Sequence, residues 1–315
     1  MRLYAHLGRR GDDRIGVLTD AGLYTAGQLA ATGKAWPMAT YQSICCVLAD
    51  DGWQPAFERM ARSAAGHRKP RTPSARRALP AIQHPEKVVC VGLNYREHAA
   101  EGGRPAPRRP LLFAKFASSI IGDGDPVVRP EGTHALDFEV ELGVVIGRSA
   151  HRVAAADAMD HVAGYVVLND VSARDWQGTP QALAEGEKGD GQWLRAKGSD
   201  TFLPMGPVMA TADALDPRDG LSLRSWRITP DGVEHPMQDG NTRDMIWDVP
   251  ALIEFISRAI TLQPGDVVAT GTPSGVGVFR DPPVFLDPGD RVRCEVEGIG
   301  SVENPIIDWD DARPS

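Results

Sequence analysis

The sequence contains no long apolar run, although 42% of its 315 residues are hydrophobic. No stretch approaches the roughly 20 apolar residues that a membrane-spanning helix needs, so we expect no membrane partner. The amino terminus, Met1 to His6, also lacks the apolar segment of a secretory signal peptide. Together these absences predict a cytoplasmic protein.

Cysteine is scarce, with four residues in the whole chain: Cys45, Cys46, Cys90 and Cys294. None of them has Cys-x-x-Cys spacing, which argues against a zinc site built on cysteine. Free thiols are typical of a reducing compartment and agree with the predicted location.

Charge is present in ordinary amount but is unevenly distributed. Residues 1–85 carry 12 basic and 6 acidic side chains, whereas the rest of the chain carries 22 basic and 36 acidic ones. The formal net charge of the whole chain is −8. The basic side chains of the first segment are scattered and the whole chain is acidic, so we expect no nucleic-acid partner. We interpret the opposite signs as attraction between two parts of one molecule.

The first 80 residues differ in pattern from the rest. Residues 14–24 predict a hairpin around Asp20-Ala21-Gly22, and residues 40–65 have helical spacing of apolar groups. Residues 67–80 contain three prolines and no periodicity, which is typical of a linker. We therefore predict a small α/β amino-terminal domain over 1–80 and a catalytic domain over 81–315.

Short β-like runs separated by Gly, Pro and Asp dominate the second part. Residues 252–260 form the clearest amphipathic helix, with Pro264-Gly265 as its stop signal. Many strands, few helices and no regular alternation predict a β-rich α+β fold, not a doubly wound sheet. The predicted strands cover 88–93, 138–146, 163–168, 266–270 and 291–296.

Two glutamates in one predicted strand form the first candidate site. Glu139 and Glu141 point to one face of the strand, while Phe138, Val140 and Leu142 point to the other. Paired carboxylates can share one cation, and without it they repel and raise each other's pKa. The alternative is a solvent-facing strand with alternating charge.

Two further segments carry groups suited to chemistry. The apolar run 163–168 leads into Asn169-Asp170 and places a carboxylate at a strand end, where sites and turns are both common. His98 and Glu101 are three residues apart, so one helical turn would bring them together. A carboxylate beside an imidazole makes it a better base. An exposed His–Glu pair on a helix is the alternative.

A glycine-rich loop and a lysine complete the set of candidates. Residues 270–277, Thr-Gly-Thr-Pro-Ser-Gly-Val-Gly, match neither a P-loop nor a Rossmann fingerprint. We expect a tight turn that offers backbone N–H groups and the Thr272 hydroxyl to a small carboxylate. Lys197 is a candidate charge partner for an anionic substrate, with a solvated lysine as the alternative.

Seven segments, taken in order, resemble the fumarylacetoacetate hydrolase family. The resemblance covers roughly residues 86–307, and residues 1–80 resemble the small amino-terminal domain of many bacterial members. The segments are Gly-Leu-Asn-Tyr-x-x-His-x-x-Glu at 92–101, Phe-Ala-Lys at 113–115, Asp-Phe-Glu-Val-Glu-Leu at 137–142, Asn-Asp-Val-Ser-Ala-Arg-Asp-x-Gln at 169–177, Ala-Lys-Gly-Ser-Asp-Thr-Phe at 196–202, Gly-Asn-Thr-Arg-Asp-Met-Ile at 240–246, and the loop 270–277.

The resemblance implies a rolled mixed β-structure, a homodimer, and Mg²⁺ or Mn²⁺ as cofactor. The residues between Gln177 and Lys197 are not shared, and we expect substrate choice to reside there. The implied metal ligands are Glu139, Glu141 and Asp170, the implied catalytic residues are His98, Glu101 and Lys197, and the implied substrate-binding residues are Gln177, Thr272 and Arg174.

The implied function is hydrolysis of a C–C bond in a small 1,3-dicarbonyl acid, such as an acylpyruvate, fumarylpyruvate or a fumarylacetoacetate-like compound. The cation would stabilise the enolate, and His98, oriented by Glu101, would activate the attacking water. Decarboxylation of a 2-oxo acid such as oxaloacetate, and keto–enol or double-bond isomerisation, are alternatives on the same site. A non-catalytic binding protein is less favoured because every implied ligand and base is present.

Overall fold

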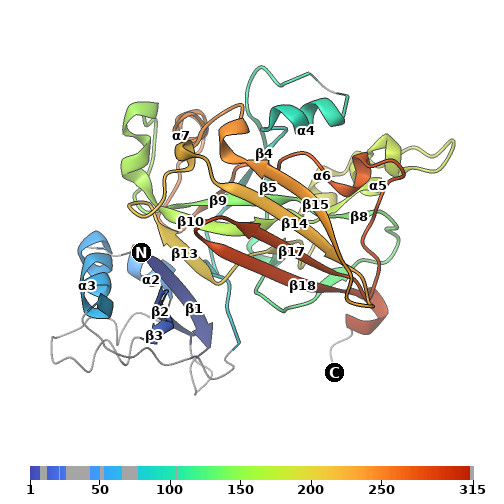
Figure 1. The fold of residues 1–315 in the computed structure, drawn as a ribbon. Helices are drawn as coiled ribbons and strands as arrows, with labels where there is room; N and C mark the ends of the chain where they lie inside the picture. Colours follow the sequence, from blue (N-terminus) through green and yellow to red (C-terminus); the bar gives the residue numbers. More distant parts are fainter. Residues whose placement is uncertain are drawn as a thin grey trace.

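The protein consists mainly of β-sheets with few helices. A computed structural model describes residues 1–7, 13–20, 22–25, 43–49, 53–65, 77–103 and 105–312. A large mixed sheet packs against a smaller one, and the helices lie around them (Figure 1). The predicted β-rich α+β fold is confirmed.

The large sheet has nine strands that run in both directions. β16 is parallel to β4, whereas β9 is antiparallel to both β10 and β16. In order across the sheet the strands are β3 (Gly22–Thr25), β2 (Asp13–Thr19), β1 (Arg2–Leu7), β13 (Val208–Thr211), β10 (Val162–Asn169), β9 (Val140–Ile146), β16 (Val267–Ala269), β4 (Val88–Gly92) and β5 (Leu111–Lys115).

The second sheet has five strands and covers one face of β9 and β10. Apolar side chains such as Leu142, Leu223 and Cys294 fill the space between the two sheets. The five strands are β15 (Glu234–Asn241), β14 (Ser222–Ile228), β17 (Arg291–Val296), β18 (Gly300–Asp308) and β7 (Val127–Arg129), and two short pairs join β11 (Ser172–Ala173) to β8 (Leu136–Asp137) and β12 (Leu203–Pro204) to β6 (Ile120–Ile121).

The alternation of side chains along β9 explains how acidic residues come to lie on a buried strand. Val140, Leu142 and Val144 belong to the core between the two sheets. On the opposite face, Val145 packs in a second core that contains the amino-terminal helices. Glu141 lies on that same opposite face, nearer the beginning of the strand. The strand starts at Val140, slightly later than predicted.

The amino-terminal residues extend the large sheet. The predicted hairpin is confirmed as β2 and β3, and β1 pairs with β13. Near the end of the predicted linker, the Leu79 amide donates to the Ala5 carbonyl at 3.1 Å. Residues 67–76 of the predicted linker lie outside the described residues. The division into domains near residue 80 therefore stays a prediction, although strands from both parts share one sheet.

The helices are short and mostly lie outside the sheets. The predicted helix near 252–260 is confirmed and begins earlier, at Val249, after the side chain of Asp248 caps it. Within the described ranges, no helix is long and apolar enough to cross a bilayer. In the described part of the chain the α-helices are α2 (Ile44–Leu48), α3 (Trp53–Ala65), α4 (Arg96–Glu101), α5 (Arg174–Gln177), α6 (Trp193–Gly198) and α7 (Val249–Ser257).

Candidate metal and active site

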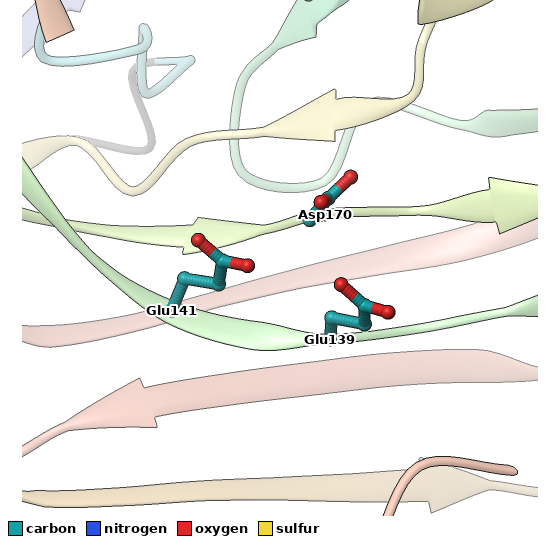
Figure 2. Close-up of side chains that lie close together, drawn as sticks. All are labelled: Glu139, Glu141 and Asp170. Carbon is teal, nitrogen blue, oxygen red and sulfur yellow. The ribbon is translucent and has the colours of Figure 1, made fainter. Parts of the chain in front are cut away.

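Three buried carboxylates meet at the ends of β9 and β10. The Asp170 amide donates to the Glu139 carbonyl at 2.8 Å, and this backbone contact sets the two residues opposite each other. Glu139 and Glu141 project toward Asp170 from the neighbouring segment (Figure 2). One carboxylate oxygen from each lies within 4.8 Å of the others. The solvent-facing alternative for Glu139 and Glu141 is therefore excluded, since both side chains are buried.

Two buried lysines contact this carboxylate cluster. Lys197 Nζ donates to Glu139 Oε2 at 2.8 Å and to Asp170 Oδ2 at 2.9 Å. Lys115 Nζ lies 2.7 Å from Asp170 Oδ1 and also donates to the backbone carbonyls of Val171, Phe202 and Lys197. Lys197 is thus buried in the site, and the alternative of a solvated side chain is excluded.

The electrostatic environment of the cluster fits a divalent cation. Burial opposes ionisation of Glu139, but Lys197 and Arg174 outweigh it and hold the pKa of this carboxyl well below its usual range. Burial raises the pKa of Glu141 well above its usual range, and Asp170 and Glu139 add to the effect. A hard cation bound by carboxylate oxygens would offset this repulsion, so Glu139, Glu141 and Asp170 suit Mg²⁺ or Mn²⁺.

His98 and Glu101 lie on α4, above the glycine-rich loop. His98 Nδ1 lies 2.7 Å from Glu101 Oε1, and the ring nitrogen is the donor because a carboxylate can only accept. In a neutral ring, Nε2 is then unprotonated and can act as a base. Glu101 Oε2 accepts from the Gly275 amide at 2.9 Å. The same loop donates the Gly271 amide to Glu141 Oε2 at 2.9 Å. The loop 270–277 thus links the acid–base pair to the carboxylate cluster.

A pocket of about 160 Å³ joins these groups. The predicted catalytic residues His98 and Lys197 line it, as do Glu139 and Glu141 of the cluster. Asp170 and Glu101 do not line the pocket themselves. Asp170 binds Lys197 and Glu101 binds His98, and both of these partners line the pocket. The predicted substrate-binding residues Gln177, Thr272 and Arg174 also line the pocket.

Two of the predicted substrate-binding residues, Gln177 and Thr272, already form hydrogen bonds within the protein. The Gln177 oxygen accepts from Arg174 at 3.0 Å and from Thr179 at 3.2 Å. Thr272 Oγ1 donates to the Val140 carbonyl at 2.8 Å and accepts from Gln238 at 2.7 Å. We infer that the Thr272 hydroxyl fixes the loop to β9.

Three buried polar residues of the site received no role from the sequence. Lys115 lies in one of the matched segments, but its contacts with Asp170 and three carbonyls depend on chain folding alone. Asp137 accepts from the amides of Gly277 and Val278 and from Arg174. Gln238 binds Val140, Thr272 and the Pro273 carbonyl. Asp137 also belongs to a matched segment, which was the one available signal for it.

Arg174 is held between two acidic side chains. Its Nε donates to Asp137 at 2.8 Å and a terminal nitrogen donates to Glu139 at 2.6 Å. The guanidinium is buried, so these contacts position Glu139 whether or not Arg174 also touches substrate.

We expect Arg174→Ala to destabilise the protein by about 3–5 kcal/mol, because it leaves Asp137 and Glu139 buried without their cation. The free energy of unfolding in urea measures this cost. Arg224, in an exposed pair with Asp239, provides the control, and Arg224→Ala should cost at most about 1 kcal/mol. Equal effects of the two substitutions would contradict the positioning role of Arg174.

Comparison with known proteins gives a consistent result. The model of the fumarylacetoacetate (FAA) hydrolase C-terminal family matches residues 87–307. Over 229 residues the chain is 46% identical to oxaloacetate tautomerase fahd2 of Xenopus laevis, described as mitochondrial, and the match covers 73% of this chain and 68% of that protein.

Solved structures resemble the chain over nearly its whole length. Fumarylacetoacetate hydrolase from Exiguobacterium antarcticum is 32% identical, with a TM-score of 0.75 and coverage of 98% of this chain and 99% of that one. A 5-carboxymethyl-2-hydroxymuconate delta-isomerase from Mycobacterium smegmatis is 33% identical, with a TM-score of 0.70 and the same coverage. The chain therefore belongs to the fumarylacetoacetate hydrolase family, as its sequence segments predict.

Proposed function

We propose that the protein is a divalent-metal-dependent tautomerase that interconverts the keto and enol forms of oxaloacetate or a similarly short 2-oxo dicarboxylic acid. The observation that carries the proposal is that carboxylates suited to a cation and the His98–Glu101 pair converge on one pocket of about 160 Å³. The 46% identity to a protein named oxaloacetate tautomerase supports this substrate over the 1,3-dicarbonyl acids first expected.

The charge of the site requires a cation if an acidic substrate is to bind. Its formal charges sum to −2, and a divalent cation would change this to 0, so the loaded site would no longer repel an anion. The charged groups counted are the carboxylates of Glu101, Asp137, Glu139, Glu141 and Asp170 and the cations of Lys115, Arg174 and Lys197.

The chain's own groups can carry out the proton transfers of tautomerisation. A divalent cation at the three carboxylates would supply Lewis acidity and stabilise the negative charge of an enolate. His98 Nε2 takes the proton from C3 of the keto acid, and Glu101 stabilises the imidazolium that results. The imidazolium then gives this proton to the C2 oxygen of the enolate, which completes the enol and restores the neutral ring. The same ring returns a proton to carbon in the reverse direction. Lys197, with a third N–H beyond its two carboxylate contacts, offsets charge on the substrate oxygens.

Hydrolysis of a C–C bond in an acylpyruvate-like acid is the second candidate. The His98–Glu101 pair favours it, because an oriented imidazole can also activate water. The 32% identity to a protein named fumarylacetoacetate hydrolase supports it as well. Decarboxylation of oxaloacetate needs no such base and is less favoured by this geometry.

A single panel of reactions separates these functions. Purified protein with Mg²⁺ or Mn²⁺ is given the enol form of oxaloacetate or a series of acylpyruvates, and enol absorbance, CO₂ and cleavage products are followed together. We expect oxaloacetate enol to disappear faster than in a sample without protein. We expect no CO₂ release and no cleavage of acylpyruvates. Cleavage to pyruvate would establish the hydrolase instead, and stoichiometric CO₂ would establish a decarboxylase.

A further inference from the structure

Two aromatic rings follow Lys197 along the wall of the pocket. The ammonium group of Lys197 lies 5.3 Å from the centre of the Phe113 ring. The Phe113 ring in turn meets Trp193 edge to face, with 5.6 Å between ring centres and 73° between ring planes. Both rings line the pocket. An apolar wall therefore begins beside the ammonium group that binds Glu139 and Asp170.

Helix α6 sets the distance between this wall and the charged end of the pocket. Trp193 and Lys197 are four residues apart on α6, so they share one face of the helix. One helical turn, about 5.4 Å along the axis, separates them. That span suits a short acid chain whose oxygens lie at the cation and whose far end reaches the indole.

The backbone that carries Trp193 is anchored to α5. The Gln192 amide donates to the Trp176 carbonyl at 3.0 Å, and the Arg195 guanidinium stacks 3.6 Å above the Trp176 ring. The segment between the helices also closes on itself, because a Cβ on Gly189 would lie only 2.3 Å from the Gly178 Cα. Because this backbone is anchored, a smaller side chain at position 193 should enlarge the pocket, and the surrounding chain should not move in to fill the space.

We propose that Trp193, supported by Phe113, is a specificity-determining residue that limits the length of the acid chain. This inference rests on the proposed function, because it assumes that the substrates of the protein are short 2-oxo acids. The segment between Gln177 and Lys197 has a sequence that the family segments do not share. Trp193 lies in this segment and lines the pocket, as do residues 178–181. The indole admits oxaloacetate and excludes homologues with longer chains.

The test is the ratio of kcat/KM for tautomerisation of a longer 2-oxo dicarboxylic acid to that for tautomerisation of oxaloacetate. We expect Trp193→Ala to raise this ratio about tenfold or more, since a hydrophobic wall discriminates single methylene groups by about that factor. Trp193→Phe should give a smaller change because it restores part of the wall. Leu194→Ala is the control, since Leu194 is the next residue on α6 but is 58% exposed and outside the pocket.

Ligand binding separates this inference from the proposed function. Calorimetry on Mn²⁺-loaded protein compares oxalate, which reports on the cation alone, with a 2-oxo acid that carries a long alkyl chain. We expect Trp193→Ala to strengthen binding of the long acid about tenfold and to leave oxalate binding unchanged. An unchanged affinity ratio would overturn the role of Trp193 whatever the activity. A shifted ratio in protein that does not tautomerise oxaloacetate would overturn only the proposed function.

Discussion

Replacement of Glu141 by glutamine should lower metal-dependent turnover of oxaloacetate by about 10²-fold or more, the usual scale for losing a group that stabilises transition-state charge. Glu141 is the carboxylate whose charge the surrounding protein offsets least, because its neighbours include Asp170 and Glu139. Its ionised form therefore depends most on a cation. Titration calorimetry with Mn²⁺ should show loss of the high-affinity site in the variant.

Stability distinguishes this effect from unfolding. Glutamine keeps the shape of the side chain and an oxygen that can accept from the Gly271 amide. It also removes a repulsive charge, so the metal-free variant should unfold at or above the wild-type temperature. Glu131→Gln, at an exposed carboxylate, should change neither metal binding nor turnover. Wild-type activity that persists in excess chelator would contradict the metal site.

Replacement of His98 by alanine should reduce tautomerisation by about 10²- to 10⁴-fold, the range for loss of a positioned acid–base group. Metal binding should survive, because His98 is not among the three residues of the carboxylate cluster. Glu101→Gln should cost less than His98→Ala, since the ring remains but its cation is less stabilised. Steady-state kinetics at saturating Mg²⁺ measures both effects.

An exposed histidine provides the control for this prediction. His151 contacts Thr261 at the surface, and His151→Ala should leave kcat and KM unchanged. Near-normal turnover by His98→Ala protein would show that another group transfers the proton. A matching loss in both histidine variants would indicate a general effect on the protein.

The sequence predicted the elements of the site better than their surroundings. Two-residue spacing was enough to place Glu139 and Glu141 together, because side chains alternate along an extended chain. Three-residue spacing predicted the His98–Glu101 contact. These two predictions succeeded because each depends on local backbone geometry, whereas Asp170 was grouped with the two glutamates only by the resemblance to the family.

Contacts between distant segments could not be predicted in this way. The sequence offered Arg174 as a substrate ligand, yet its pairing with Asp137 and Glu139 arises only when the folded chain brings α5 to these two residues. Lys115 lies at the end of β5 and reaches Asp170, which follows β10, and no spacing along the chain reveals this contact. The wall formed by Trp193 follows a segment without periodicity, so its position depended on tertiary structure.

Proton exchange at C3 of oxaloacetate in D₂O, followed by ¹H NMR with Mg²⁺ and catalytic amounts of protein, tests the proposed chemistry most directly. We predict that the C3 protons exchange much faster than in a protein-free sample with the same Mg²⁺, while oxaloacetate itself stays intact. Chelator should return the rate to the protein-free value. Exchange no faster than in the protein-free sample, or pyruvate as the first product, would contradict a metal-dependent tautomerase.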